Sequence, residues 1–109
     1  MKKFMALYMG SGGSAPAMDA EAMERGMAAW GGWMGKHQAV IVDAGGPLGS
    51  TKKASAEGLA DTRNLFTGYV IVQAESHDAA VRMFENHPHF AIFPGDSVEV
   101  MEVLPIPGT

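Results

Sequence analysis

The hydrophobic pattern of the chain changes from helix spacing to strand spacing near residue 39. Before this point Met23, Met27, Trp30 and Met34 recur every three or four residues, which is the spacing of one helix face. Residues 39–43 then form a run rich in β-branched side chains, as is typical of a strand. A glycine-proline corner follows this run. A helix that leads directly into a strand indicates an α+β fold.

The other predicted elements lie on either side of this stretch. Apolar runs at residues 3–9 and 66–74 predict the first and third strands, and residues 97–104 predict the fourth. Asp19 and Ser76 are suited to cap two helices, the first over residues 20–36. The second is expected to end near His87, because the residue before a proline disfavours the helical conformation. The order β-α-β-β-α-β predicts a ferredoxin-like α+β protomer with a four-stranded antiparallel sheet and two helices on one face.

Two of the predicted strands are apolar on both faces. Alternate residues of a strand point to opposite sides, and both sets are apolar in residues 3–9 and 66–74. Two helices cover only one face, whereas an antiparallel sheet with a solvated face alternates apolar and polar residues. We therefore predict a homodimer in which the sheets of two copies pack face to face around a two-fold axis.

Length, charge and cysteine content exclude several classes of protein. The 109 residues are 47% apolar, which predicts one domain over residues 1–109. With 8 basic and 12 acidic residues and no basic run, the chain lacks the surface that nucleic-acid binding requires. Because the chain has no cysteine, disulfides, thiolate nucleophiles and zinc-thiolate sites are excluded.

The N-terminal apolar run is too short to be a targeting segment. Residues 4–9 number fewer than the roughly seven to fifteen apolar residues of a signal peptide. No stretch approaches the roughly eighteen apolar residues of a transmembrane helix. We therefore predict a cytoplasmic protein with no membrane partner.

Two segments allow more than one interpretation, and the first helix is unusual in its glycine content. The glycine-rich residues 10–16 suggest a phosphate-binding loop, but they lack its lysine and spacing, which favours a flexible connector or a mobile flap. Residues 50–64 form either a ragged hairpin that extends the sheet or a cover over a pocket. The first helix carries four glycines, each costing about 1 kcal/mol relative to alanine. We expect close approach of the helix to the sheet to compensate for Gly26, Gly31, Gly32 and Gly35.

The candidate catalytic residues are His89, His87 and Asp43. Asp43 ends an apolar strand, where a carboxylate either bonds to the amides of the glycine corner or faces a cavity. His87 and His89 flank Pro88, and an imidazole near a carboxylate in a cleft is the usual acid-base pair. The alternatives are a helix cap and a solvated loop histidine. The spacing of His87 and His89, two residues apart, also suits two metal ligands. No third ligand is evident, so no metal and no cofactor is predicted.

Aromatic residues supply the remaining candidates for a ligand pocket. Trp30 and Trp33 on the first helix pack in the core or line a cavity, and Tyr8 lies on the first strand. The predicted pocket residues are Tyr8, Trp30, Trp33, Asp43 and His89.

Six segments in order also carry a family resemblance. They are KKFMALYMG, W-x-x-W-M-G, V-D-A-G-G-P-L-G, F-T-G-Y-V-I-V-Q-A, H-P-H and S-V-E-V-M-E-V-L-P-I-P. Together they resemble the YCII-related family, also called the DGPF family, of dimeric α-β barrel proteins. The resemblance implies a ferredoxin-like protomer and a dimer with a cavity between sheet and helices on each side. It also implies small-molecule chemistry, since a related member is a dehydrochlorinase acting on a chlorinated aromatic intermediate.

The sequence departs from the family pattern in two places. The D-G-P-F motif is absent, because the matching region before the third strand reads LADTRNLF. The proposed family dyad pairs a histidine on the first helix with an aspartate before a proline. Here the first position falls at about Ala29 or Trp30, and the second is His87.

Two functions follow from these patterns. In the first, a homodimer binds a small molecule in the cavity between sheet and helices without chemistry. In the alternative, the protein is an isomerase, lyase or dehydrochlorinase-like enzyme, in which His89 or His87 moves a proton and Asp43 orients or assists it.

Overall fold

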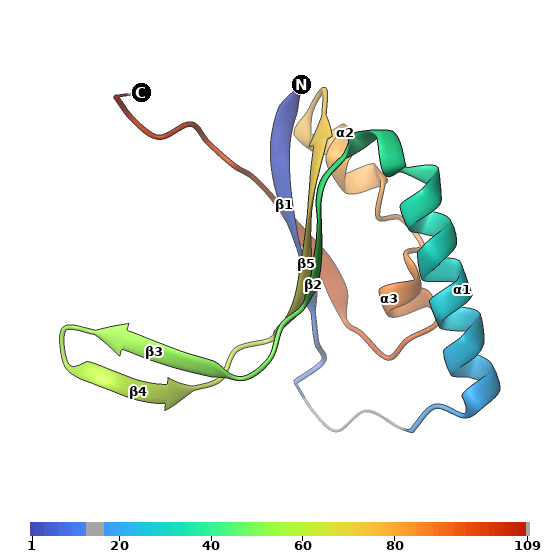
Figure 1. Ribbon diagram of the computed structural model, residues 1–109, viewed down its shortest axis with the longest axis horizontal. Coiled ribbons are helices and arrows are strands. Elements are labelled where there is room, and N and C mark those ends of the chain that lie inside the picture. Colours follow the sequence, from blue (N-terminus) through green and yellow to red (C-terminus); the bar gives the residue numbers. More distant parts are fainter. Residues whose placement is uncertain (13–16, 109) are drawn as a thin grey trace.

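A four-stranded antiparallel sheet with helices on one face forms the body of the molecule (Figure 1). The computed structural model describes residues 1–12 and 17–108. The strands lie in the order β2-β5-β1-β6, comprising Ile41–Pro47, Phe66–Ala74, Lys2–Met9 and Ser97–Glu102. The helices are α1 (Ala20–Lys36), α2 (His77–Arg82) and α3 (Pro88–Ala91). The predicted ferredoxin-like α+β class is confirmed.

The caps of both main helices are as the sequence predicts. The Asp19 Oδ1 atom accepts a hydrogen bond from the Ala22 N–H at 2.7 Å, and α1 spans the predicted residues. The Ser76 Oγ atom accepts from the Ala79 N–H at 3.1 Å. Short-range side-chain acceptors therefore define where both helices begin.

The second predicted helix is shorter than expected, and a further short helix follows it. α2 ends at Arg82, and Asn86 has a positive φ of 56° that a helix does not accommodate. His87 is extended and caps α3, in which Pro88 takes the first helical position. The proline thus begins a short helix in a segment for which the sequence predicted neither a helix nor a strand.

β2 begins and ends later than the sequence predicts. A 3-10 turn over Gln38–Val40 precedes it, and the strand continues through the glycine corner. Gly45 makes this possible, because it has a φ of 67° and a Cβ atom there would collide with the Tyr69 carbonyl oxygen. β6 is shorter than predicted and ends at Glu102. The close approach at Gly45 holds β2 against β5.

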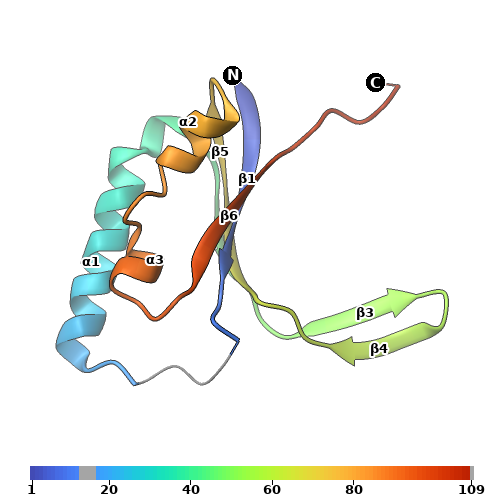
Figure 2. The same cartoon turned by 180° about the vertical axis from the view of Figure 1, so that it is seen from behind.

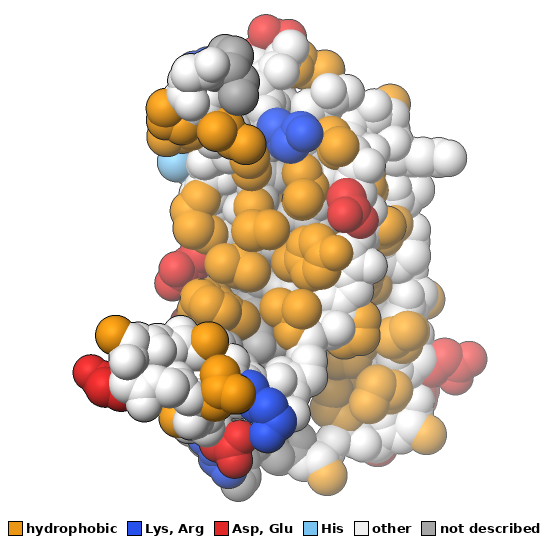
Figure 3. Space-filling view, turned by 60° about the vertical axis from the view of Figure 1, so that its left-hand side comes forward, with side chains coloured by type: hydrophobic (Ala, Val, Ile, Leu, Met, Phe, Trp, Pro, Cys, Tyr) orange, Lys and Arg blue, Asp and Glu red, His pale blue; other side chains and the backbone are white. Residues whose placement is uncertain are grey.

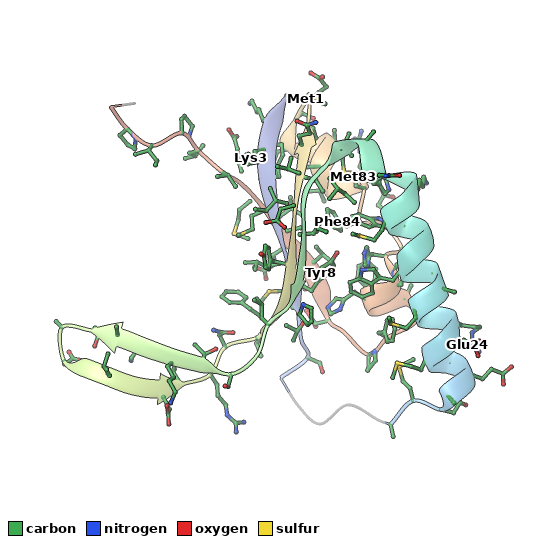
Figure 4. The ribbon with its side chains drawn as sticks, viewed as in Figure 1. Met1, Lys3, Tyr8, Glu24, Met83 and Phe84 are labelled. Carbon is green, nitrogen blue, oxygen red and sulfur yellow. The ribbon has the colours of Figure 1, made fainter. Side chains whose placement is uncertain are left out.

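The core lies between the sheet and the helices. β1 and β5 direct alternate side chains to this side, and Ala80 and Phe84 pack against them from the segment around α2. Val81, the residue after Ala80, is 46% exposed, because α2 turns it outward. Figure 4 shows Tyr8, Met83 and Phe84 in this layer.

The helix glycines are explained only in part by close packing. A Cβ atom at Gly26 would collide with the Phe93 ring, which lies between α3 and β6 rather than on the sheet. Built Cβ atoms at Gly31, Gly32 and Gly35 meet no described atom within 4 Å. The expected compensation by the sheet is therefore wrong for these three positions, which leave open space beside α1.

Residues 50–64 contain a hairpin that forms a sheet of its own. β3 (Thr51–Ser55) pairs with β4 (Gly58–Thr62) in an antiparallel ladder. The hairpin projects away from the body on the side opposite the helices (Figure 2). Lys52 and Asp61 form an exposed ion pair across it at 2.8 Å. The predicted hairpin is present, but it does not extend the main sheet.

The predicted connector at residues 10–16 lies partly, at 13–16, outside the described residues.

The sheet face opposite the helices carries a group of apolar side chains that the described residues leave half-buried or exposed. Met5 pairs with Ile71 and Met101, and Leu7 pairs with Tyr69, so all five side chains share this side. Figure 3 shows hydrophobic side chains gathered over it. We refer to these five residues as the outer sheet face. In the described parts of the chain, no helix has the length and apolar character needed to cross a membrane.

Candidate functional site

Tyr8 is the centre of an aromatic cluster on the helix side of β1. Its ring centroid lies 4.9 Å from that of Trp30, 5.2 Å from that of His87 and 5.3 Å from that of His89. Burial raises the pKa of the Tyr8 hydroxyl well above its usual range. Tyr8 is therefore a neutral hydroxyl group at physiological pH.

His87 lies behind Tyr8 and is fully buried, with 0% of its surface exposed. As the cap of α3, its Nδ1 atom accepts the His89 backbone N–H at 3.0 Å. Its Nε2 atom lies 3.4 Å from the Tyr8 hydroxyl oxygen. Burial, and then the charges of His89 and His37, lower the pKa of His87 to about 4. The ring is therefore neutral near pH 7.

His89 is held in one orientation by the backbone. Its Nε2–H donates to the Met9 carbonyl at 2.8 Å, and the same oxygen accepts the Asp96 N–H at 2.9 Å. Gly95 makes room for the ring, because a Cβ atom there would collide with it. The Nδ1 atom has no hydrogen-bond partner within residues 1–12 and 17–108. In the neutral ring this nitrogen carries a lone pair and can accept a proton.

The two tryptophans of α1 have different surroundings. Trp30 stands edge-on to His87, with ring centroids 4.6 Å apart and an angle of 89° between the planes. Trp33 is buried, and its Nε1–H donates to the Met83 carbonyl at 2.7 Å. This bond anchors α1 to the end of α2, which leaves Trp30 as the tryptophan that borders open space.

A cavity of about 460 Å³ lies between the sheet and α1. Aromatic rings and backbone form most of its wall, which includes Tyr8, Trp30, Gly31, Gly46, His89 and Phe93. Thr67, His89 and Phe93 also border a second hollow of about 890 Å³ beside Gly10 and Arg63. The smaller cavity contains the aromatic cluster and is therefore the candidate site.

The structure brings some of the predicted site residues together and separates others. Tyr8, Trp30 and His89 line the cavity, whereas His87 supports Tyr8 from behind. Among the described residues, Trp33 and Asp43 do not border this cavity. Asp43 is exposed, and its Oδ1 atom accepts the Gly45 N–H at 2.8 Å. This is the corner hydrogen bond that the sequence left as one of two interpretations.

Sequence reasoning did not identify Phe93, Gly31 or Gly46 as parts of the cavity wall. Phe93 lies in an irregular segment with no period, so no local signal was available for it. The glycine clusters were a usable signal, since glycine leaves space beside a backbone.

No metal cluster is found in the described parts of the chain. No group of three or more histidine, aspartate and glutamate side chains there could hold an ion. Three of the four ring nitrogens of His87 and His89 already face a protein donor or acceptor.

Fold and site together define a ferredoxin-like α+β protein with an aromatic-walled cavity between its sheet and first helix. No family model and no curated protein matches the sequence. Among solved structures the chain is similar to TftG, the 5-chloro-2-hydroxyhydroquinone dehydrochlorinase from Burkholderia phenoliruptrix AC1100, in complex with 2,5-dihydroxybenzoquinone. The TM-score is 0.57 at 21% sequence identity, over 91% of this chain and 90% of that chain. This similarity shows a shared fold.

Proposed function

We propose that this protein binds a small, flat molecule in the cavity between its sheet and α1. The observation that carries the proposal is a space of about 460 Å³ walled mainly by aromatic rings and backbone, with Tyr8 and His89 among its few polar groups. Ligand sites are commonly of this size and composition, with a few polar groups that orient the ligand. Flat rings are favoured because they stack against Tyr8, Trp30 and Phe93.

The comparison supports this proposal at the level of the fold. TftG was solved in complex with 2,5-dihydroxybenzoquinone, which is a small flat molecule. The motif resemblance supports the same interpretation, and we propose that the chain belongs to the YCII-related family.

Filling the cavity from α1 tests the proposal. Gly31 borders the cavity and has open space where a side chain would begin, so Gly31→Leu would occupy the site. We expect the affinity for 2,5-dihydroxybenzoquinone, measured by isothermal titration calorimetry, to fall by at least about tenfold, since a filled cavity excludes the ring.

Gly32→Leu is the matched control for this experiment. It makes the same change on the next residue of α1, also with no described atom within 4 Å of its Cβ, and Gly32 does not border the cavity among the described residues. Both variants gain helix propensity of about 1 kcal/mol or less. Equal binding by wild type and both variants would place the ligand elsewhere.

We also propose that two copies form a homodimer through the outer sheet face. Five apolar side chains from three adjacent strands share this face, and the described residues leave them half-buried or exposed. Exposed apolar patches of this kind mark interaction surfaces. A second copy offers the same patch, so a two-fold axis closes the assembly.

Proton transfer is the second candidate function, and the orientation of His89 favours it. The Met9 carbonyl holds the proton on Nε2, so the unpartnered Nδ1 atom is placed to act as a general base. His87 is less suited to this role, because its Nδ1 atom is occupied by the His89 N–H. Asp43 lies outside the cavity wall and bonds to Gly45, so we base this candidate on His89 alone.

Hydrogen exchange on a carbon acid tests the catalytic role of His89. In deuterated buffer, the protein is expected to speed exchange at a C–H next to the single carbonyl of a bound flat ring, such as 1-indanone. His89→Gln should lower this rate at least about tenfold, because the amide is not a base. Proton NMR measures the exchange. The same exchange rate in the wild type and the variant would contradict a role of His89 in proton transfer. It would not contradict the proposal that the cavity binds a ligand.

A further inference from the structure

The hydrogen bond between His87 and His89 determines where the proton of His87 lies. A backbone N–H can only donate, so the His87 Nδ1 atom, 3.0 Å from the His89 nitrogen, accepts with its lone pair. A neutral imidazole then carries its hydrogen on Nε2. That nitrogen lies 3.4 Å from the Tyr8 hydroxyl oxygen, which it meets as a donor.

This arrangement determines which role the Tyr8 hydroxyl can play. Its oxygen accepts from the His87 Nε2–H, so its own hydrogen cannot point at the same nitrogen. No acceptor for that hydrogen is found among the described residues. Tyr8 borders the cavity, and no described residue competes with a ligand there for this hydrogen.

His89 has the complementary role in the same cavity. Its only ring N–H is used by the Met9 carbonyl, which leaves a lone pair on Nδ1. The centroids of the Tyr8 and His89 rings are 5.3 Å apart. One small molecule can therefore meet a fixed donor and a fixed acceptor together.

We propose that His87 is a positioning residue that makes Tyr8 a hydrogen-bond donor, so that the cavity selects flat hydroxy-carbonyl compounds. A carbonyl oxygen of such a ligand accepts from the Tyr8 O–H, and its hydroxyl group donates to the His89 Nδ1 atom. This inference rests on the proposed function, because it names the chemical class of ligand for the same cavity. Binding needs no covalent step.

Three small ring compounds test separately the hydrogen bond from Tyr8 and the hydrogen bond to His89. Maltol carries a hydroxyl group beside a ring carbonyl, its methyl ether keeps only the carbonyl, and phenol keeps only the hydroxyl group. We expect calorimetry to show that the wild type binds maltol at least about tenfold more tightly than either analogue, because a site built for a polar partner rejects a molecule that lacks it.

Two variants distinguish positioning from mere structural support. Tyr8→Phe is expected to reduce the preference for maltol over phenol about tenfold, because it removes the donor to the carbonyl. His87→Phe is expected to reduce this preference by a smaller factor, because the Tyr8 hydroxyl then rotates freely. The preference for maltol over its ether should persist, since it depends on His89. A purely structural role for His87 would lower all three affinities together and leave both preferences unchanged.

The tautomers are measurable in the wild type without any substitution. Nitrogen-15 NMR of the imidazoles at neutral pH is expected to show the Nε2–H form for both His87 and His89, and an Nδ1–H form of His87 would overturn the positioning role. Equal affinity for maltol and its ether, with 2,5-dihydroxybenzoquinone still bound, would overturn the ligand class alone. Failure of all these rings to bind would overturn the proposed function as well.

Discussion

Met101→Lys is expected to raise the dissociation constant of the proposed homodimer by about 100-fold or more. Met101 lies on β6 directly opposite Met5, within the outer sheet face, and is 41% exposed in the single chain. Two-fold symmetry places the substitution in the interface twice, where each lysine would be desolvated against apolar side chains, with Glu99 two residues away on the same side of β6. Desolvating a charge costs several kcal/mol, and about 2.7 kcal/mol corresponds to 100-fold. Sedimentation velocity over a range of concentrations measures the change.

Val81→Lys is the control, because it makes a similar change elsewhere on the surface. Val81 is 46% exposed on α2, on the helix side of the sheet. We expect this variant to self-associate as the wild type does. A wild type that sediments only as a monomer at micromolar concentration, or a Met101→Lys variant with unchanged association, would contradict the homodimer.

Acidification from pH 7.5 to pH 4.5 is expected to lower the free energy of unfolding by about 2 to 3 kcal/mol through His87. The pKa of this residue falls from 6.5 to about 4 on folding. Between these values the unfolded chain binds a proton that the folded chain excludes, so stability falls as the pH falls. Tyr8, His89 and His37 are the titratable groups that face or influence His87, and none of them offers a compensating negative charge near neutral pH.

Urea unfolding followed by tryptophan fluorescence, at fixed protein concentration, measures this loss. His87→Phe keeps a ring in the aromatic cluster and removes the titrating group. Between pH 7.5 and pH 4.5, the free energy of unfolding of this variant should fall by about 2 to 3 kcal/mol less than that of the wild type. Identical pH dependence in the two proteins would show that His87 does not resist protonation.

Local signals in the sequence determined where most elements lie. The caps at Asp19 and Ser76 act on backbone groups three residues away, so short-range chemistry set the start of α1 and α2. The third predicted strand, β5, coincides with its predicted residues, because the apolar run Tyr69–Val72 lies at its centre. The same patterns indicated an apolar outer face, since strand periodicity assigns each side chain to a side of the sheet.

Elements without a local signal were missed or displaced. α3 could not be read from the sequence, because Pro88 is compatible both with the end of one helix and with the start of the next. The left-handed conformation at Asn86 decided between these possibilities. Likewise, β2 runs through the glycine corner only because Gly45 fits against the Tyr69 carbonyl, a contact between separate strands.

The sequence named some of the residues that border the candidate site, but not their arrangement. Tyr8, Trp30 and His89 were all named from the sequence, yet the division of roles between His87 and His89 depends on which ring nitrogen meets which backbone group. Tyr8 and His87 are 79 positions apart in the chain. Residue type and periodicity carry the chemistry and the local conformation, whereas the packing of β1, α1 and α3 alone decides which side chains meet and which atoms remain free.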